Sequence, residues 1–110
     1  MLYLTQSTKI LLALSPIDFR KQIDGLVALC EQKFSEDARS GQLFVFINKA
    51  YSMIRVLCYE ENGYWIATKR LSRGRYALWP CDREAITRPL IASELTKILR
   101  TYIASKRKKL

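Results

Sequence analysis

The stretch from Lys69 to Pro80, KRLSRGRYALWP, carries the side chains in this chain that are best suited to bind an anion. Four cations fall within seven residues of it, with no carboxylate between them: Lys69, Arg70, Arg73 and Arg75. Arginine presents a planar fork of donors that matches phosphate, and Gly74 lets a backbone approach a ligand closely. The stretch therefore predicts a phosphate-binding surface. The alternative is a solvated strand end and loop whose cations serve only solubility, because charge runs are common on surfaces.

Further cations are candidates for the same surface. If Asn62-Gly63 is a two-residue hairpin turn, Arg55 lies opposite Arg70, and such like charges destabilise a strand pair unless an anion joins them. Arg20 and Lys21 lie off the apolar stripe of a predicted helix. They form either a surface ion pair with Asp24 or contacts with a ligand. We favour the structural role for Asp24 and the ligand role for Arg20, and we include both Arg20 and Lys21 in the predicted binding surface.

Aromatic side chains lie close to these cations in the sequence, at Trp65, Tyr76 and Trp79. Beside arginine they can stack on bases or sugars, and Trp79 is included in the predicted binding surface. The alternative is that they form the lid of a small core.

The chain offers little for catalysis. It has no histidine, its three cysteines (Cys30, Cys58 and Cys81) are widely spaced, and it contains neither a P-loop nor GxGxxG. Asp18 and Asp24 lie six residues apart in the predicted helix, which does not build a paired acid–base site within one element. We therefore expect no enzyme, no metal and no cofactor.

Several elements must position the cations. Residues 9–14 and the apolar run 43–47 predict strands, the second of them central, and 53–59 with 64–71 predict a hairpin. Ser15 and Pro16 predict the start of a helix over 17–34, and Pro89 that of a second helix. The apolar stripes of these helices are Phe19, Ile23, Leu26, Val27, Cys30 and Phe34 in the first, and Ile91, Leu95, Ile98, Leu99, Tyr102 and Ile103 in the second. The expected fold is α+β, an antiparallel sheet of about four to five strands with two amphipathic helices packed on it.

Composition bounds the class of protein. The chain has 110 residues, about half of them apolar, and a net charge of +9. We expect one compact domain over 1–104 and a basic tail over 105–110 that attracts polyanions. The charge favours nucleic acid or an anionic surface as the partner. No apolar run approaches the roughly 20 residues that span a bilayer, the N-terminus is a poor signal peptide, and the cysteine usage suggests a cytoplasmic protein.

Three segments, taken in order, carry a family resemblance from about Ile10 to Arg100. They are SPIDFRKQIDGLVALC, SGQLFVFINK and IRVLCYEENGYWIATKRLSRGRYALWP. Their order and spacing resemble the TnpB-type accessory protein encoded by the second reading frame of IS66-like insertion sequences, which is distinct from the RNA-guided nucleases also called TnpB. Two departures stand out: the pair of residues between Tyr76 and Trp79 is one longer than usual, and Ile91 replaces the threonine of a Leu-Thr-x-x-Glu-Leu helix start.

The resemblance implies a role in transposition beside a separate transposase, and it supplies no catalytic residues. Together with the cations, it leads to the hypothesis of a non-enzymatic protein that binds DNA through sequence-independent phosphate contacts. The alternative is an adaptor that docks an acidic patch on the transposase or another accessory factor through the same cations.

Overall fold

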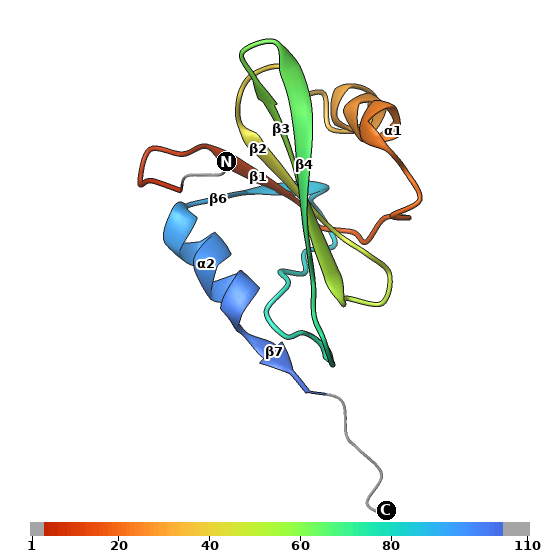
Figure 1. Cartoon of the computed structure of the whole chain (residues 1–110), viewed down its shortest axis with the longest axis vertical. Helices are drawn as coiled ribbons and strands as arrows, with labels where there is room; N and C mark the ends of the chain where they lie inside the picture. Colours follow the sequence, from red (N-terminus) through yellow and green to blue (C-terminus); the bar gives the residue numbers. More distant parts are fainter. Residues whose placement is uncertain (1–3, 105–110) are drawn as a thin grey trace, which may run out of the picture.

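The computed structural model describes residues 4–104, and its main feature is a five-stranded sheet (Figure 1). Along the chain the elements are β1 (Ile10–Ala13), α1 (Ile23–Ala28), η1 (Leu29–Lys33, a π-helical turn), β2 (Leu43–Ile47), β3 (Met53–Glu60), β4 (Gly63–Arg70), β5 (Arg75–Tyr76), β6 (Thr87–Leu90), α2 (Ala92–Arg100) and β7 (Tyr102–Ile103). The sheet has the order β4-β3-β2-β1-β6, and β5 pairs separately with β7. The predicted basic tail, 105–110, lies outside the described residues.

The predicted α+β class is confirmed, with one difference in strand direction. β1 and β2 run parallel, with Ile10 beside Leu43, while the other neighbouring pairs of the large sheet are antiparallel. The connection between β1 and β2 carries α1 across one face and returns the chain to the same end of the sheet. Such a crossover makes two strands parallel.

The sheet is covered on both faces. α2 packs on one face through Leu95 and Ile98, and α1 with η1 packs on the other through Leu26 and Cys30 (Figure 1). All five residues of β2 are buried, which confirms the prediction of a central strand. A leucine as buried as Leu26 or Leu95 contributes about 2 kcal/mol to folding.

The first helix begins later than predicted. The N–H of Ile17 donates to the carbonyl of Ile47 at 2.9 Å, so the segment after β1 runs beside the end of β2. Asp18 then closes a turn by accepting the N–H of Arg20 at 2.9 Å. Ser15 therefore caps no helix, and α1 begins at Ile23 after Gln22, which supplies no side-chain cap. Strand pairing has replaced the helix start that the local sequence favours.

The β3–β4 hairpin is confirmed, but the register predicted for it is wrong. Glu60 pairs with Gly63, so the turn residues are Glu61 and Asn62, and Glu61 adopts the left-handed φ of 57°. Arg55 consequently lies opposite Thr68 and not opposite Arg70. The opposed arginine pair that suggested a bridging anion does not exist.

The second helix also begins later than predicted. Pro89 lies in β6 opposite Leu11, at the edge of the sheet, where a residue without an N–H is tolerated. α2 begins at Ala92, and the side chain of Glu94 accepts the N–H of Ile91 at 3.0 Å. The predicted stripe is buried at Leu95 and Ile98, but Tyr102 and Ile103 belong to β7 and are half exposed. No helix within 4–104 has the length and apolar character needed to cross a bilayer.

Candidate nucleic-acid interface

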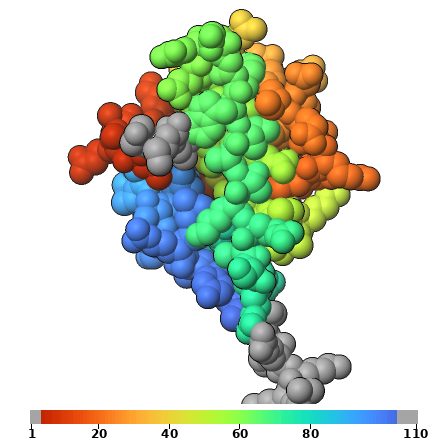
Figure 2. Space-filling model, in the orientation of Figure 1, coloured from red at the N-terminus to blue at the C-terminus, as the bar shows by residue number. Residues whose placement is uncertain are grey.

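A groove of about 590 Å³ lies where the end of β4 meets the end of α2. Figure 2 shows this region at the lower end of the molecule, where the segment after β4 (teal) lies beside the end of α2 (blue). We call it the basic groove. Its described lining residues are Lys69, Arg70, Leu71, Ser72, Arg73, Leu99, Arg100, Tyr102 and Ala104. Four of these are cations and none is acidic, so the groove is suited to an anion.

The wall of the groove depends on Gly74. Its φ is +84°, and a Cβ placed there would come within 2.0 Å of the carbonyl oxygen of Ile103. Only glycine lets β5 approach β7 this closely. Tyr76, which follows in β5, is buried and donates its N–H to the carbonyl of Tyr51 at 2.7 Å. The β5–β7 pair is thereby tied to the core, and it holds Tyr102 at the groove.

Arg75 faces a different hollow. It lines a space of about 230 Å³ with Ile103, Tyr51 and Trp79, among others, and it is not among the residues that line the basic groove. Arg75 pairs with Ile103 across β5 and β7, and both residues line this hollow and not the groove. The structure therefore brings Lys69, Arg70 and Arg73 together and directs Arg75 away from them.

Trp79 is half buried and joined to the sheet. Its indole N–H lies 3.2 Å from the carbonyl oxygen of Ala13 and 3.1 Å from that of Leu14, and donates to both. The ring packs against the same core cluster as Tyr76 and Trp65. These contacts match the core-lid alternative, and part of the Trp79 ring still borders the hollow that holds Arg75.

Arg55 is occupied by contacts within the protein. Its guanidinium donates to the carbonyl of Phe19 at 2.9 Å, to the carbonyl of Lys21 at 3.2 Å and to the hydroxyl of Thr68 at 3.0 Å. It also lies 4.5 Å from the centre of the Phe19 ring, which is a cation–π contact. Arg55 thus holds the segment before α1 against β3 and β4.

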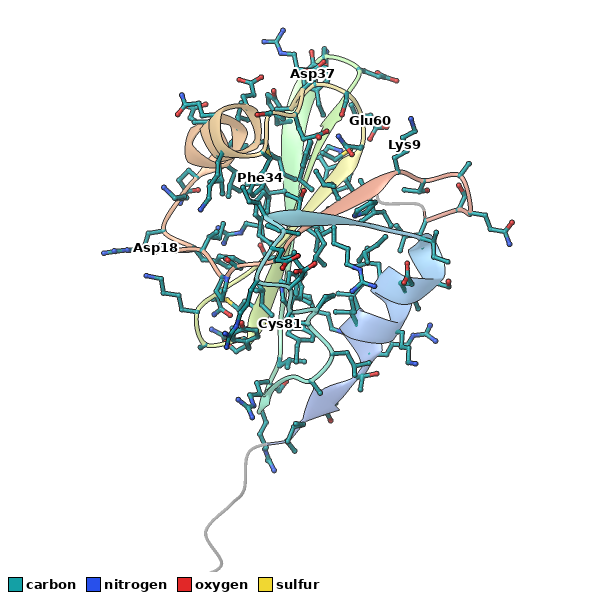
Figure 3. All side chains as sticks on the ribbon, turned by 180° about the vertical axis from the view of Figure 1, so that it is seen from behind. Lys9, Asp18, Phe34, Asp37, Glu60 and Cys81 are labelled. Carbon is teal, nitrogen blue, oxygen red and sulfur yellow. The ribbon has the colours of Figure 1, made fainter. Side chains whose placement is uncertain are left out.

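Arg20 is paired with Asp18, and not with Asp24. The closest contact joins Arg20 Nη2 to Asp18 Oδ2 at 2.6 Å, and it is the one salt bridge found among residues 4–104. The hydrogen bonds from Arg20 hold the pKa of the Asp18 carboxyl well below its usual range. In Figure 3, Asp18 lies at the side of the molecule, away from β7 at the lower end. Neither Arg20 nor Lys21 lines the basic groove.

Lys69 has a structural contact inside the groove. Its Nζ donates to the carbonyl of Leu99 at 2.8 Å, near the C-terminus of α2. The last carbonyls of a helix have no partner within it and carry partial negative charge, so a lysine there stabilises the helix. By contrast, Arg70, Arg73 and Arg100 form no salt bridge with another described residue.

The described residues offer no metal site and no reactive pair of cysteines. No group of three potential metal ligands occurs within 4–104. Cys30 and Cys58 are buried free thiols and Cys81 is exposed. Burial raises the pKa of Cys30 to about 12, so this thiol stays protonated at neutral pH.

Comparison with known proteins identifies the family. Residues 8–109 match the family described as "IS66 Orf2 like protein". The chain belongs to this family. The resemblance read from the motifs is confirmed, and the protein is an IS66-family accessory protein. The match spans β1 to β7, so it includes every residue that lines the basic groove.

Two relatives of this IS66 Orf2-like protein come from Sinorhizobium fredii (strain NBRC 101917 / NGR234). The uncharacterized protein y4jC is 31% identical over 82 residues, which cover 74% of this chain and 70% of the relative. The uncharacterized protein y4hO is 30% identical over 75 residues, which cover 68% of this chain and 64% of the relative. No solved structure matches the chain significantly.

Motif residues of the IS66 Orf2-like pattern have structural roles in this chain. Asp18 closes the turn before α1, Leu26 is fully buried, and Gly74 permits the β5–β7 contact. Two groove residues, Arg100 and Tyr102, are not among the cations and aromatics that the sequence pattern singles out. No local pattern links them to Arg73, because the β5–β7 pairing and the packing of α2 on the sheet bring these distant segments together.

Proposed function

We propose that this protein supports transposition without catalysing a reaction, by binding the phosphates of DNA in the basic groove. Arg70, Arg73 and Arg100 supply the phosphate contacts, and Lys69 mainly holds α2 in place. Arg75 extends the basic surface on the other side of β5, with Trp79 beside it. Arg20 and Lys21 contribute at most a distant contact, and Arg55 acts in the fold.

The observation that carries this proposal is the groove itself. Three arginines from two distant parts of the chain meet in it, and no carboxylate belongs to its described lining. Arginine offers five donors in a fixed fork, which match a phosphate in two-point contacts. Arginines held together without acids repel one another, and an anion removes that repulsion.

A salt titration of duplex binding tests the proposal. Removing one phosphate contact reduces the slope of log affinity against log salt by about 0.9 for duplex DNA. The triple variant R70A/R73A/R100A should therefore bind weakly, with a slope reduced by about 2 to 3. A control variant, K9A/K33A/R83A, removes the same charge from positions outside the groove and should keep most of the slope. Equal slopes in the two variants would refute the groove as the phosphate site.

A second candidate function is docking to the transposase. The hollow around Arg75 favours it, because Ile103 there is half exposed and lies beside an arginine and a tryptophan. Arginine, aromatic and apolar side chains together are typical of the centre of a protein interface. Capture of the element's transposase from nuclease-treated extract, abolished in Arg75→Glu and retained in the groove triple variant, would support this function. Capture that depends on the groove arginines or on nucleic acid would contradict it.

A further inference from the structure

Tyr102 gives the basic groove a property that phosphate contacts alone do not require. It lines the groove, yet 53% of its surface is exposed. Its partner across the β5–β7 pair, Tyr76, is 3% exposed and lies in the core. Leu71 and Leu99 also line the groove. The site therefore combines an apolar, aromatic surface with the four cations.

The position of Tyr102 is set by the backbone around it. β7 pairs with β5 at Tyr76, and the N–H of Ala77 donates to the carbonyl of Thr101 at 3.3 Å. The close approach at Gly74 leaves β7 little room to move toward β5. Because the backbone at Tyr102 is already ordered by these contacts, only the side chain loses conformational freedom when a ligand stacks on the ring, which favours binding.

We infer that the basic groove binds single-stranded nucleic acid, with one unpaired base stacked on Tyr102 and the flanking phosphates on Arg73 and Arg100. This inference rests on the proposed function and names the form of its ligand. In a duplex the bases are already stacked on one another, so only the cations would contact it. In a single strand every base offers a face to an aromatic ring, whatever its identity. The groove volume lies within the range of about 300–1,000 Å³ typical of small-ligand sites, which suits one nucleotide.

The test compares oligothymidine with a duplex of the same length, using fluorescence anisotropy on the full chain. Tyr102→Leu keeps apolar bulk but removes the ring, and Tyr102→Phe keeps the ring. Ile103→Ala is the matched control. Ile103 is the next residue in the chain, its side chain is as exposed as that of Tyr102, and it lies outside the groove. Far-UV circular dichroism and urea unfolding establish that each variant is folded.

The wild type should bind oligothymidine more tightly than the duplex. Tyr102→Leu should weaken oligothymidine binding by about tenfold, the scale of one base–aromatic stack, without changing the salt slope. Its duplex affinity should stay the same, and Tyr102→Phe and Ile103→Ala should resemble the wild type. Photo-crosslinking of a strand that contains 5-iodouracil should label the tryptic peptide 101–106, which carries Tyr102.

The possible failures are distinguishable. If Tyr102→Leu binds oligothymidine like the wild type while R70A/R73A/R100A binds neither ligand, stacking on Tyr102 is refuted and the phosphate groove stands. If the wild type binds neither ligand at physiological salt, the proposed function fails together with this inference. A single-stranded RNA that binds more tightly than oligothymidine, and still depends on the Tyr102 ring, supports the inference and identifies RNA as the source of the strand.

Discussion

Replacement of Gly74 by alanine tests the contact that builds the groove. Two effects add at this position. The φ of +84° lies in the left-handed region, which costs an L-residue with a side chain about 1–2 kcal/mol. The new Cβ would also lie 2.0 Å from the backbone oxygen of Ile103, and no side-chain rotation relieves a contact with backbone. β5 and β7 must then separate, which breaks hydrogen bonds worth about 1 kcal/mol each.

The expected decrease in the free energy of unfolding is therefore about 2–4 kcal/mol, within a total of about 5–15 kcal/mol for a domain. Urea unfolding followed by circular dichroism measures it. Under conditions where this variant is still folded, it should also bind nucleic acid more weakly than the wild type, because separation of β5 from β7 moves Tyr102 away from Arg73.

Two other glycines serve as matched controls. Gly41 has a φ of +87°, but its Cβ would meet only the carbonyl of Tyr59, at 4.0 Å, so Gly41→Ala should show the backbone strain alone. Gly63 has no atom within 4 Å of its Cβ and no left-handed φ, so Gly63→Ala should be neutral or stabilising by up to about 1 kcal/mol. If Gly74→Ala is no less stable than Gly41→Ala, the close β5–β7 contact is refuted.

Three other predictions address the helix start, the arginine contacts and the thiols. Ile91→Thr should stabilise the protein by about 1 kcal/mol in thermal unfolding, because the threonine hydroxyl can accept the N–H of Glu94. Ile91→Val should change the stability little, and equal stability of the two variants would contradict this account of the cap. Arg55→Lys should destabilise the protein by about 1–3 kcal/mol in urea unfolding, since a compact ammonium cannot reach all three separate acceptors that the guanidinium fork contacts. Wild-type stability of this variant would show that those hydrogen bonds contribute nothing. Ellman's reagent should titrate one thiol, Cys81, in the native protein and three after unfolding; fast reaction of Cys30 or Cys58 would contradict their burial.

The strands and the hairpin followed from local patterns. The run at 43–47 is apolar on both faces, and 53–59 with 64–71 flank a turn, so their pairing needed no distant information. The helix starts failed for a physical reason. Ser15-Pro16 and Pro89 are good local start signals, but backbone pairing of Ile17 with Ile47 and of Pro89 with Leu11 extends the chain there. Tertiary hydrogen bonds outweigh a preference of about 1 kcal/mol at a cap.

The candidate site divides in the same way. The cations from Lys69 to Arg75 are adjacent in sequence, and three of them do line one groove. Sequence could not separate Arg75 from them, because the pairing of β5 with β7, two segments distant along the chain, places Arg75 beside Ile103 in the other hollow. It also could not show that Arg55 binds the carbonyls of Phe19 and Lys21, which lie far away along the chain.

By itself the sequence determined the α+β class, the central strand, the excess of positive charge and the motifs of the family. Those properties are local or additive, so each can be read without knowing which segments meet. The tertiary structure alone decided which cations face solvent together and which bind the protein's own carbonyls. It also placed Arg100 and Tyr102 beside Arg73, because a glycine at position 74 lets two short strands distant in sequence come into contact.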